Sequence, residues 1–416
     1  MKIDSICGEL VDYRGSQGEQ CIIMDKGYIT SITEEPRGKT LDYRGTGYII
    51  IPGLIDLHVH LRGLQLQYKG DEAIGTLNAL KSGITLVVDM PNTKPYLNTR
   101  EALLLKLEAL RENSYTDYGV YAGIPHATSE LERIAELPIA GFKAYPRDLE
   151  KTSTLEDILS RGHLLIVHSE DPMSDGIEAE DLETRASLRH CYVETLGLEY
   201  LQGLEGPIHI THASCPTTIR EAKTRGYTVD TTPHHLLLDN KNHDNCLYKV
   251  NPPLRDPQTR EEMLRELLEG RIDALASDHA PHARWEKADP LACRPGITWL
   301  PYWPWIIYRA LVAPGLMKLE DFLYMTSRKP AEILGLENYG HTEPGARANL
   351  VVLDPSYKYR YHEAASQGRN PVYHWMREAQ GQPVGVIVGG HLAFDWIRGV
   401  IERSVVVNAF GVRYSV

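Results

Sequence analysis

Apolar runs of strand length alternate with helix-like segments through the central part of this chain of 416 residues. Eight such runs can be counted, at residues 53–60, 84–90, 118–124, 139–145, 163–168, 207–212, 227–232 and 272–278. Amphipathic helical patterns separate them, for example at residues 71–81, 100–111, 182–202 and 261–269. Eight strand-then-helix units predict an α/β fold, a parallel (β/α)8 TIM-type barrel.

The two ends of the chain show a different pattern. Short alternating segments broken by turns fill residues 1–52, and similar segments return at residues 348–354 and 384–395. Alternation of apolar and polar residues without a helical period is typical of β-strands. We therefore expect the ends to pair into one small composite β-sandwich domain, formed by residues 1–52 and 341–416, beside a barrel that spans residues 53–340.

The composition is that of an ordinary soluble globular protein, with 42% hydrophobic and 24% charged residues. The formal net charge of -12 and the lack of a basic stripe argue against binding to nucleic acid or to an anionic membrane. The first residues do not resemble a signal peptide, and no apolar run approaches the length needed to span a membrane. We expect a cytoplasmic protein.

The cysteines are scattered and form no Cys-x-x-Cys pair. They are Cys7, Cys21, Cys191, Cys215, Cys246 and Cys293. This spacing suits neither a thiolate zinc site nor a disulfide framework. We expect inert thiols in a reducing cytosol, although intracellular disulfides of hyperthermophiles are a known exception.

Two histidines lie two residues apart in the first apolar run. In a strand, His58 and His60 point to the same face, and Arg62 follows one step later. Neutral imidazole is a common zinc ligand, so the pair could bind one ion. Two polar residues that fill the lumen of a barrel are an equally good interpretation of this pair taken alone.

Further residues capable of chemistry lie at or just after the carboxyl ends of other strand-like runs, where a (β/α)8 barrel places its active site. They are Asn92, Lys143, His168, His212 and Asp278. Taken singly, each has an ordinary explanation: a lysine stem along apolar surface, histidines bonded in the core, or an aspartate that caps a helix. Their shared position at strand ends instead favours a common site.

Together, four histidines, a lysine and an aspartate indicate a two-metal hydrolytic site. Neighbouring cations lower the pKa of a lysine, and its neutral amine can then add carbon dioxide to give a carbamate with one oxygen for each metal. One Zn2+ would be held by His58, His60 and Asp278 and the other by His168 and His212, with the carboxylated Lys143 shared. A bridging water would be acidified for attack, and Asp278 would shuttle its proton. The same ligands also suit cobalt or manganese.

The sequence resembles the amidohydrolase superfamily and, more narrowly, the dihydroorotases, over nearly the whole chain. The motifs that carry the resemblance are His-x-His-x-Arg at residues 58–62, Met-Pro-Asn-Thr at 90–93, Thr-Pro-His-His-Leu at 232–236, Asn-Pro-Pro-Leu-Arg at 251–255 and Ser-Asp-His-Ala-Pro-His at 277–282. The resemblance implies reversible hydrolysis of (S)-dihydroorotate to N-carbamoyl-L-aspartate in pyrimidine biosynthesis, by a metal-bridging hydroxide with Asp278 as general base and acid.

By the same resemblance, residues from several loops would recognise the substrate. Arg62 and Asn92 would hold its carboxylate, Asn251 and His282 would complete the recognition, and the backbone near Pro295 and Gly296 would face the ring amide. A guanidinium suits this task because it makes charge-assisted hydrogen bonds to carboxylates. Arg62 could instead be a lumen cation that balances Asp56.

Several alternatives stay open. Hydantoinases and allantoinases share these metal ligands but have a different pocket, and some dihydroorotase-like proteins are inactive partners of aspartate carbamoyltransferase. Family members often have Arg-Glu-Pro-Gly after the histidine pair, whereas Gly63 follows Arg62 here. One branch of the family has aspartates just after the lysine position, and an aspartate there can serve in place of the carbamate, which makes Asp148 a rival to Lys143. The oligomeric state, monomer or homo-oligomer, is also open.

Overall fold

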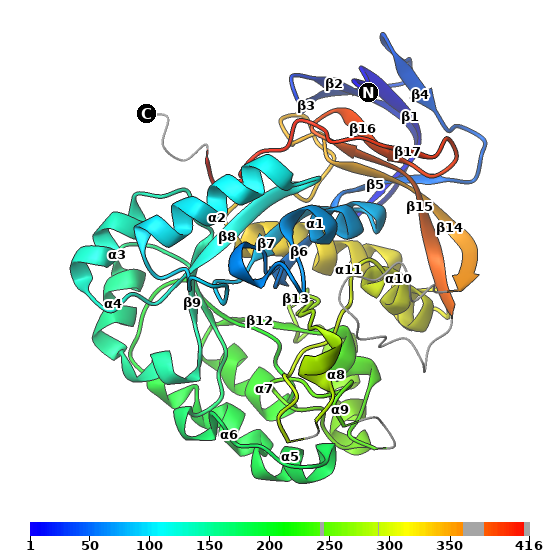
Figure 1. Ribbon diagram of the computed structural model, residues 1–416. Helices are drawn as coiled ribbons and strands as arrows, with labels where there is room; N and C mark the ends of the chain where they lie inside the picture. The colour runs from blue at the N-terminus through cyan, green and yellow to red at the C-terminus, as the bar shows by residue number, and fades with distance from the viewer. Residues whose placement is uncertain (242–244, 290, 361–377, 412–416) are drawn as a thin grey trace.

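The computed structural model describes residues 1–416 apart from 242–244, 290, 361–377 and 412–416. Its centre is a barrel of eight parallel strands (Figure 1). The strands are β6 (Leu54–Val59), β7 (Ile84–Asp89), β8 (Asp117–Gly123), β9 (Gly141–Ala144), β10 (Leu165–Val167), β11 (Ile208–Ile210), β12 (Thr228–Thr231) and β13 (Ala274–Leu275). They pair in chain order, and an isolated parallel bridge between Val59 and His279 joins the first strand to the last. Each predicted run overlaps one strand, so the predicted barrel is confirmed.

Helices surround the barrel (Figure 1). They are α1 (Glu72–Lys81), α2 (Arg100–Asn113), α3 (Thr128–Ala135), α4 (Thr152–Ser160), α5 (Leu182–Leu188), α6 (Cys191–Leu196), α7 (Pro216–Thr224), α8 (Pro233–Leu237), α9 (Pro257–Leu268), α10 (Trp303–Ile307), α11 (Leu319–Leu323) and α12 (Lys329–Ile333). Several start at side-chain caps: Asp71, Thr99 and Asp256 each accept a backbone N–H of the first turn.

The single helix predicted over residues 182–202 is wrong. That segment divides into α5, α6 and a 3-10 turn at Glu199–Leu201. The backbone leaves the helical conformation at Arg189, with φ of -111° and ψ of 55°, and His190 then caps α6. Capping and backbone conformation thus override a continuous amphipathic pattern, and the break directs Arg189 towards the pocket described below.

The two ends of the chain pair into one sheet, as predicted. Its strands are β1 (Ser5–Asp12), β2 (Gly15–Asp25), β3 (Tyr28–Thr33), β4 (Thr40–Asp42), β5 (Ile49–Pro52), β14 (Leu350–Arg360), β15 (Glu378–Val388), β16 (His391–Asp395) and β17 (Val400–Ile401). The central strand β5 joins the two ends, because it pairs in parallel with β1 and antiparallel with β14. The boundaries 1–52, 53–340 and 341–416 remain a prediction.

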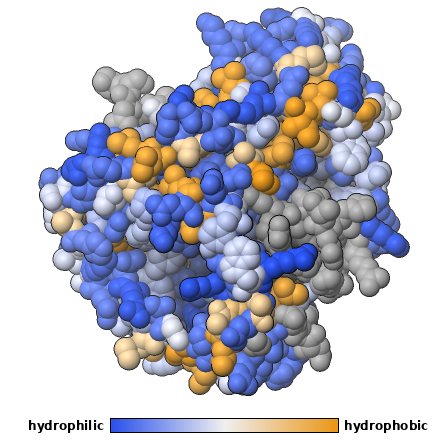
Figure 2. Space-filling model, in the orientation of Figure 1, coloured by the Kyte–Doolittle hydropathy of each residue, from blue (hydrophilic) through white to orange (hydrophobic). Residues whose placement is uncertain are grey.

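The apolar core lies mainly between the strands and helices of the barrel, where Val87, Leu103 and Leu131 belong to one buried cluster. A separate cluster of buried side chains, which includes Ile6, Ile22 and Leu350, belongs to the sheet formed by the two chain ends. The face of the molecule in Figure 2 is largely hydrophilic, with separate hydrophobic patches. Among the described residues, no helix combines the length and the apolar character required to cross a bilayer.

The expectation of inert thiols is wrong, because all six cysteines are paired. Disulfides join Cys7 to Cys21, Cys191 to Cys215, and Cys246 to Cys293. Their Cα atoms lie 4.0, 5.6 and 5.7 Å apart although the partners are 14, 24 and 47 residues apart in sequence. The first pair is opposite across β1 and β2, and the second links α6 to the start of α7. Folding creates these proximities, and sequence spacing does not reveal them.

Thiol titration checks these pairings. Protein denatured without a reductant should react with no thiol reagent, and reduction should release its six thiols. A disulfide contributes roughly 2–4 kcal/mol to stability, so reduction should also lower the melting temperature by several degrees. Six reactive thiols before reduction would restore the original expectation.

Candidate active site

A pocket of about 430 Å³ opens where the barrel strands end. It is lined by ten of the predicted site residues: His58, His60, Arg62, Asn92, His168, His212, Asn251, Asp278, Pro295 and Gly296. A larger pocket of about 690 Å³, beside α10 and the terminal sheet, contains none of them. Chemistry rather than size therefore identifies the site.

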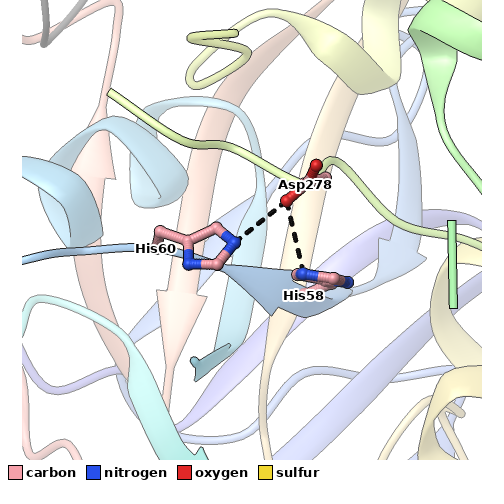
Figure 3. A group of neighbouring side chains, drawn as sticks. All are labelled: His58, His60 and Asp278. Carbon is pink, nitrogen blue, oxygen red and sulfur yellow. Dashed lines mark hydrogen bonds and ion pairs between the residues drawn. The ribbon is translucent and has the colours of Figure 1, made fainter. Parts of the chain in front are cut away.

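Three of the predicted metal ligands converge (Figure 3). His58 Nε2 lies 3.3 Å and His60 Nε2 3.0 Å from Asp278 Oδ1. One ligand atom from each residue lies within 4.8 Å of the others, and all three side chains are buried. His58 lies in the first strand, His60 directly follows it and Asp278 follows the eighth, so closure of the barrel assembles this group.

Hydrogen bonds on the far side of each ring fix which nitrogen carries the proton. His58 Nδ1 donates to Thr211 Oγ1 at 2.6 Å, because that hydroxyl gives its own proton to a neighbouring carboxylate. His60 Nδ1 donates to Asn92 Oδ1 at 2.6 Å. Both Nε2 atoms therefore present lone pairs to the Asp278 carboxylate, an arrangement that needs a cation between them. The group fits a divalent metal ion.

A second group lies beside this one. The ring centroids of His168 and His212 are 4.5 Å apart, and those of His58 and His212 are 5.1 Å apart. Lys143 Nζ and His212 Nδ1 are buried and have no hydrogen-bond partner among the described residues. Buried polar atoms without partners are costly. Both nitrogens would be satisfied at a second ion, the lysine as its carbamate, so the donor set fits a two-metal centre.

Burial favours the uncharged forms that metal binding requires. It lowers the pKa of Lys143 to about 7. Burial and the charges of neighbouring lysine and histidine groups also hold the pKa values of His58 and His212 well below the usual range. Neutral imidazoles can bind metal, and a neutral amine can add carbon dioxide.

Two carboxylates that orient the histidines were not predicted from the sequence. Asp230, within β12, accepts from Thr211 Oγ1 at 2.9 Å. Glu170 accepts from His168 Nε2 at 2.6 Å and forms an ion pair with Arg189. Burial raises the pKa of Glu170, but the charge of Arg189 and the hydrogen bond from His168 outweigh burial and hold this pKa well below its usual range. Two features of the sequence indicate these partners. Asp230 is an acidic residue inside a buried strand, and Glu170 lies two positions after His168, a candidate metal ligand. Metal-binding histidines usually have such carboxylate partners.

Arg62 lies beyond the end of β6, in a left-handed conformation with φ of 68°. Its guanidinium donates to the carbonyl of Pro281 at 3.3 Å and to Asn92 Oδ1 at 3.4 Å, and lies 3.3 Å from His282 Nε2. The Asp56 carboxylate instead accepts from backbone N–H groups, and no ion pair joins it to Arg62 among the described residues. Charge balance with Asp56 therefore does not explain Arg62.

The other predicted recognition residues surround the same pocket. Asn251 Oδ1 accepts from Arg185 and from Arg189, which leaves its amide N–H groups to face a ligand. His282 does not line the pocket itself, and its Nε2 donates to the carbonyl of Pro295 at 3.0 Å. Gly296 has φ of 143°, and an added Cβ would lie 2.6 Å from a backbone oxygen, so glycine is required there.

Asp148, the rival of Lys143, is engaged elsewhere. Its Oδ2 accepts from the backbone N–H of Tyr145 at 3.1 Å, and its Oδ1 lies 2.8 Å from Lys151 Nζ. Neither Asp148 nor Lys143 lines the pocket, so the lining does not separate the two candidates. Both Asp148 oxygens have partners, whereas the buried Lys143 Nζ has none among the described residues, so Lys143 is the better candidate for a bridging ligand.

Residues 49–393 match the model of the Amidohydrolase family. The chain belongs to this family. Among solved structures, the L-hydantoinase (dihydropyrimidinase) from Arthrobacter aurescens superposes with a TM-score of 0.87 at 22% identity, over 97% of this chain and 98% of that one. This likeness concerns the fold.

Comparison with curated protein sequences gives relatives that share one activity. The chain is 43% identical to the dihydroorotase of Aeropyrum pernix over 341 residues, 78% of each protein. It is 38% identical to the dihydroorotase of Sulfolobus acidocaldarius over 397 residues, which covers 93% of this chain and 96% of the relative. The resemblance to dihydroorotases predicted from the motifs is confirmed.

Proposed function

We propose that this protein is a dihydroorotase, which reversibly hydrolyses (S)-dihydroorotate to N-carbamoyl-L-aspartate in pyrimidine biosynthesis. The observation that carries the proposal is the position of Arg62. Its guanidinium donates to Asn92 and lies near His282, and Arg62 lines the same pocket as the histidines and Asp278. A buried guanidinium beside a hydrolytic site suits a small cyclic amide that bears a carboxylate. The dihydroorotase relatives support the same assignment.

The proposed cofactor is a pair of zinc ions in the sites described above. His58, His60 and Asp278 would hold one ion and His168 and His212 the other, with the carboxylated Lys143 shared. When bound, such ions lower the pKa of a water molecule and polarise a carbonyl group.

The side chains of the pocket supply orientation and proton transfer. Arg62 and Asn92 hold the substrate carboxylate, which fixes the ring with its amide bond over the histidine cluster. The Asp278 carboxylate takes the proton of the attacking water and passes it to the departing ring nitrogen. In the reverse direction Asp278 removes a proton from the ureido nitrogen as that nitrogen attacks the substrate carboxylate carbon, and passes it to the carboxylate oxygen that leaves as hydroxide when the ring closes.

Substrate preference tests the proposal. Zinc- and bicarbonate-loaded protein is assayed for dihydroorotate hydrolysis and carbamoyl-aspartate cyclisation beside hydantoin and allantoin. Turnover of dihydroorotate supports the proposal. Turnover of hydantoin or allantoin alone would replace it by the other cyclic-amide hydrolases. Gel filtration with and without aspartate carbamoyltransferase tests the alternative of an association with that enzyme, and it also gives the oligomeric state.

Arg62→Ala is expected to lower kcat/KM for dihydroorotate about 100-fold, because a buried charge-assisted contact is lost. Metal content, measured by inductively coupled plasma mass spectrometry, should stay at the wild-type value. Arg111→Ala, which removes an exposed arginine of α2, is the matched control and should behave as wild type. Wild-type kcat/KM in Arg62→Ala would exclude the proposed anchor.

A further inference from the structure

The backbone at Arg62 adopts a conformation that non-glycine residues seldom occupy, with φ of 68°. From this turn the guanidinium reaches Asn92 and His282, and the carbonyl oxygen accepts from Lys106 Nζ at 2.9 Å. An unfavourable conformation persists only where surrounding groups hold it. The groups behind Arg62 therefore determine where its guanidinium lies.

Lys106 is the centre of a buried charged network behind this turn. Its Nζ donates to Glu72 Oε1 at 2.6 Å and to the Arg62 carbonyl, and forms an ion pair with Asp89 Oδ2 at 2.7 Å. The three side chains come from α2, α1 and β7 and are 0%, 6% and 0% exposed. Asp89 Oδ1 also accepts from the backbone N–H of Leu61 at 2.8 Å. The network thus binds the chain at both residue 61 and residue 62.

The same network explains the glycine that follows. Gly63 has φ of 66°, and an added Cβ would lie 2.0 Å from Glu72 Oε1. A glutamate at this position, as in the Arg-Glu-Pro-Gly pattern, would displace Glu72 from Lys106. Gly63, which departs from that pattern, therefore leaves the space that Glu72 needs in order to reach Lys106.

We infer that Lys106 is a positioning residue that holds the Arg62 guanidinium in place for the substrate carboxylate. Lys106 is fully buried and does not line the pocket, so it acts through Arg62. The inference rests on the proposed function, in which Arg62 binds that carboxylate. An ion network that served stability alone would affect the melting temperature without affecting substrate affinity.

The double variant Lys106→Met/Glu72→Gln separates these roles. It removes the ammonium together with one carboxylate, so the network keeps a single negative charge, that of Asp89. KM for dihydroorotate should rise about 10-fold or more, while kcat stays within about threefold and metal content is unchanged. The matched control is Arg347→Met, which breaks a buried 3.0 Å pair with Asp117 and should lower the melting temperature without changing KM.

Each outcome discriminates. If wild-type protein turns over dihydroorotate and the folded double variant has the wild-type KM, the positioning role is overturned and the proposed function stands. If wild-type protein loaded with metal does not turn over dihydroorotate, the proposed function fails and the inference fails with it. If the double variant does not fold, the isosteric Asp89→Asn decides by the same KM criterion, since it weakens the hold on Lys106 with little change in shape.

Discussion

Asp278→Asn is expected to lower kcat for dihydroorotate hydrolysis about 10³-fold, because the side chain loses its ability to accept and return a proton. Among the described residues that line the pocket, Asp278 and Asp175 are the two carboxylates, and Asp175 is paired with Arg147. No second carboxylate is therefore free to replace Asp278 there. Asparagine keeps the size of the side chain and the Oδ1 atom that faces both histidines. Steady-state kinetics with metal analysis of the same sample measures the effect.

Asp175→Asn is the control for this experiment, because it removes a carboxylate of the same pocket that has an ion-pair partner and is 49% exposed. Its kcat should change far less. A near wild-type kcat in Asp278→Asn with full metal content would show that another group moves the proton.

Lys143→Ala is expected to lose both bound metal and activity, with turnover reduced about 10³-fold or more. The physical reason is the fully buried Nζ, which has no hydrogen-bond partner among the described residues and whose pKa is lowered to about 7 by burial. Removal of the side chain leaves a space beside His168 and His212 that a small carboxylate can enter. Added acetate or propionate should therefore restore part of the metal content and activity.

Lys151→Ala provides the comparison, since Lys151 is the partly exposed lysine paired with Asp148. It should retain metal and should not respond to acetate. Full activity in Lys143→Ala would transfer the bridging role to Asp148, in spite of the bonds that hold Asp148 at Tyr145 and Lys151.

The parts of this molecule that depend on strand order could be predicted from the sequence. In a parallel barrel all strands end on one face, so residues that follow the apolar runs converge there wherever they lie in the chain. His58, His212 and Asp278 illustrate this, because each was assigned from its position at the carboxyl end of a run and all line one pocket. The exact register of the strands was not needed.

The parts that depend on loop conformation could not be predicted. Cys246 and Cys293 lie in loops whose approach no periodicity records. The break at Arg189, which brings that side chain to Glu170, interrupts a pattern that looks helical throughout. Arg62 was expected one step along the strand, but it lies in a left-handed turn after the strand has ended. These features depend on local backbone angles and long-range packing, which a single sequence does not determine.

The bridge between Val59 and His279, which joins the first barrel strand to the last, has a consequence for biosynthesis of the protein. His60 and Asp278 meet across this seam although 218 residues separate them in the chain. A nascent polypeptide on the ribosome therefore carries the other five proposed ligands, His58, His60, Lys143, His168 and His212, before Asp278 has been made. The proposed metal centre is complete only when Asp278 has emerged and docked beside His60, so the unfinished chain lacks one of its proposed ligands.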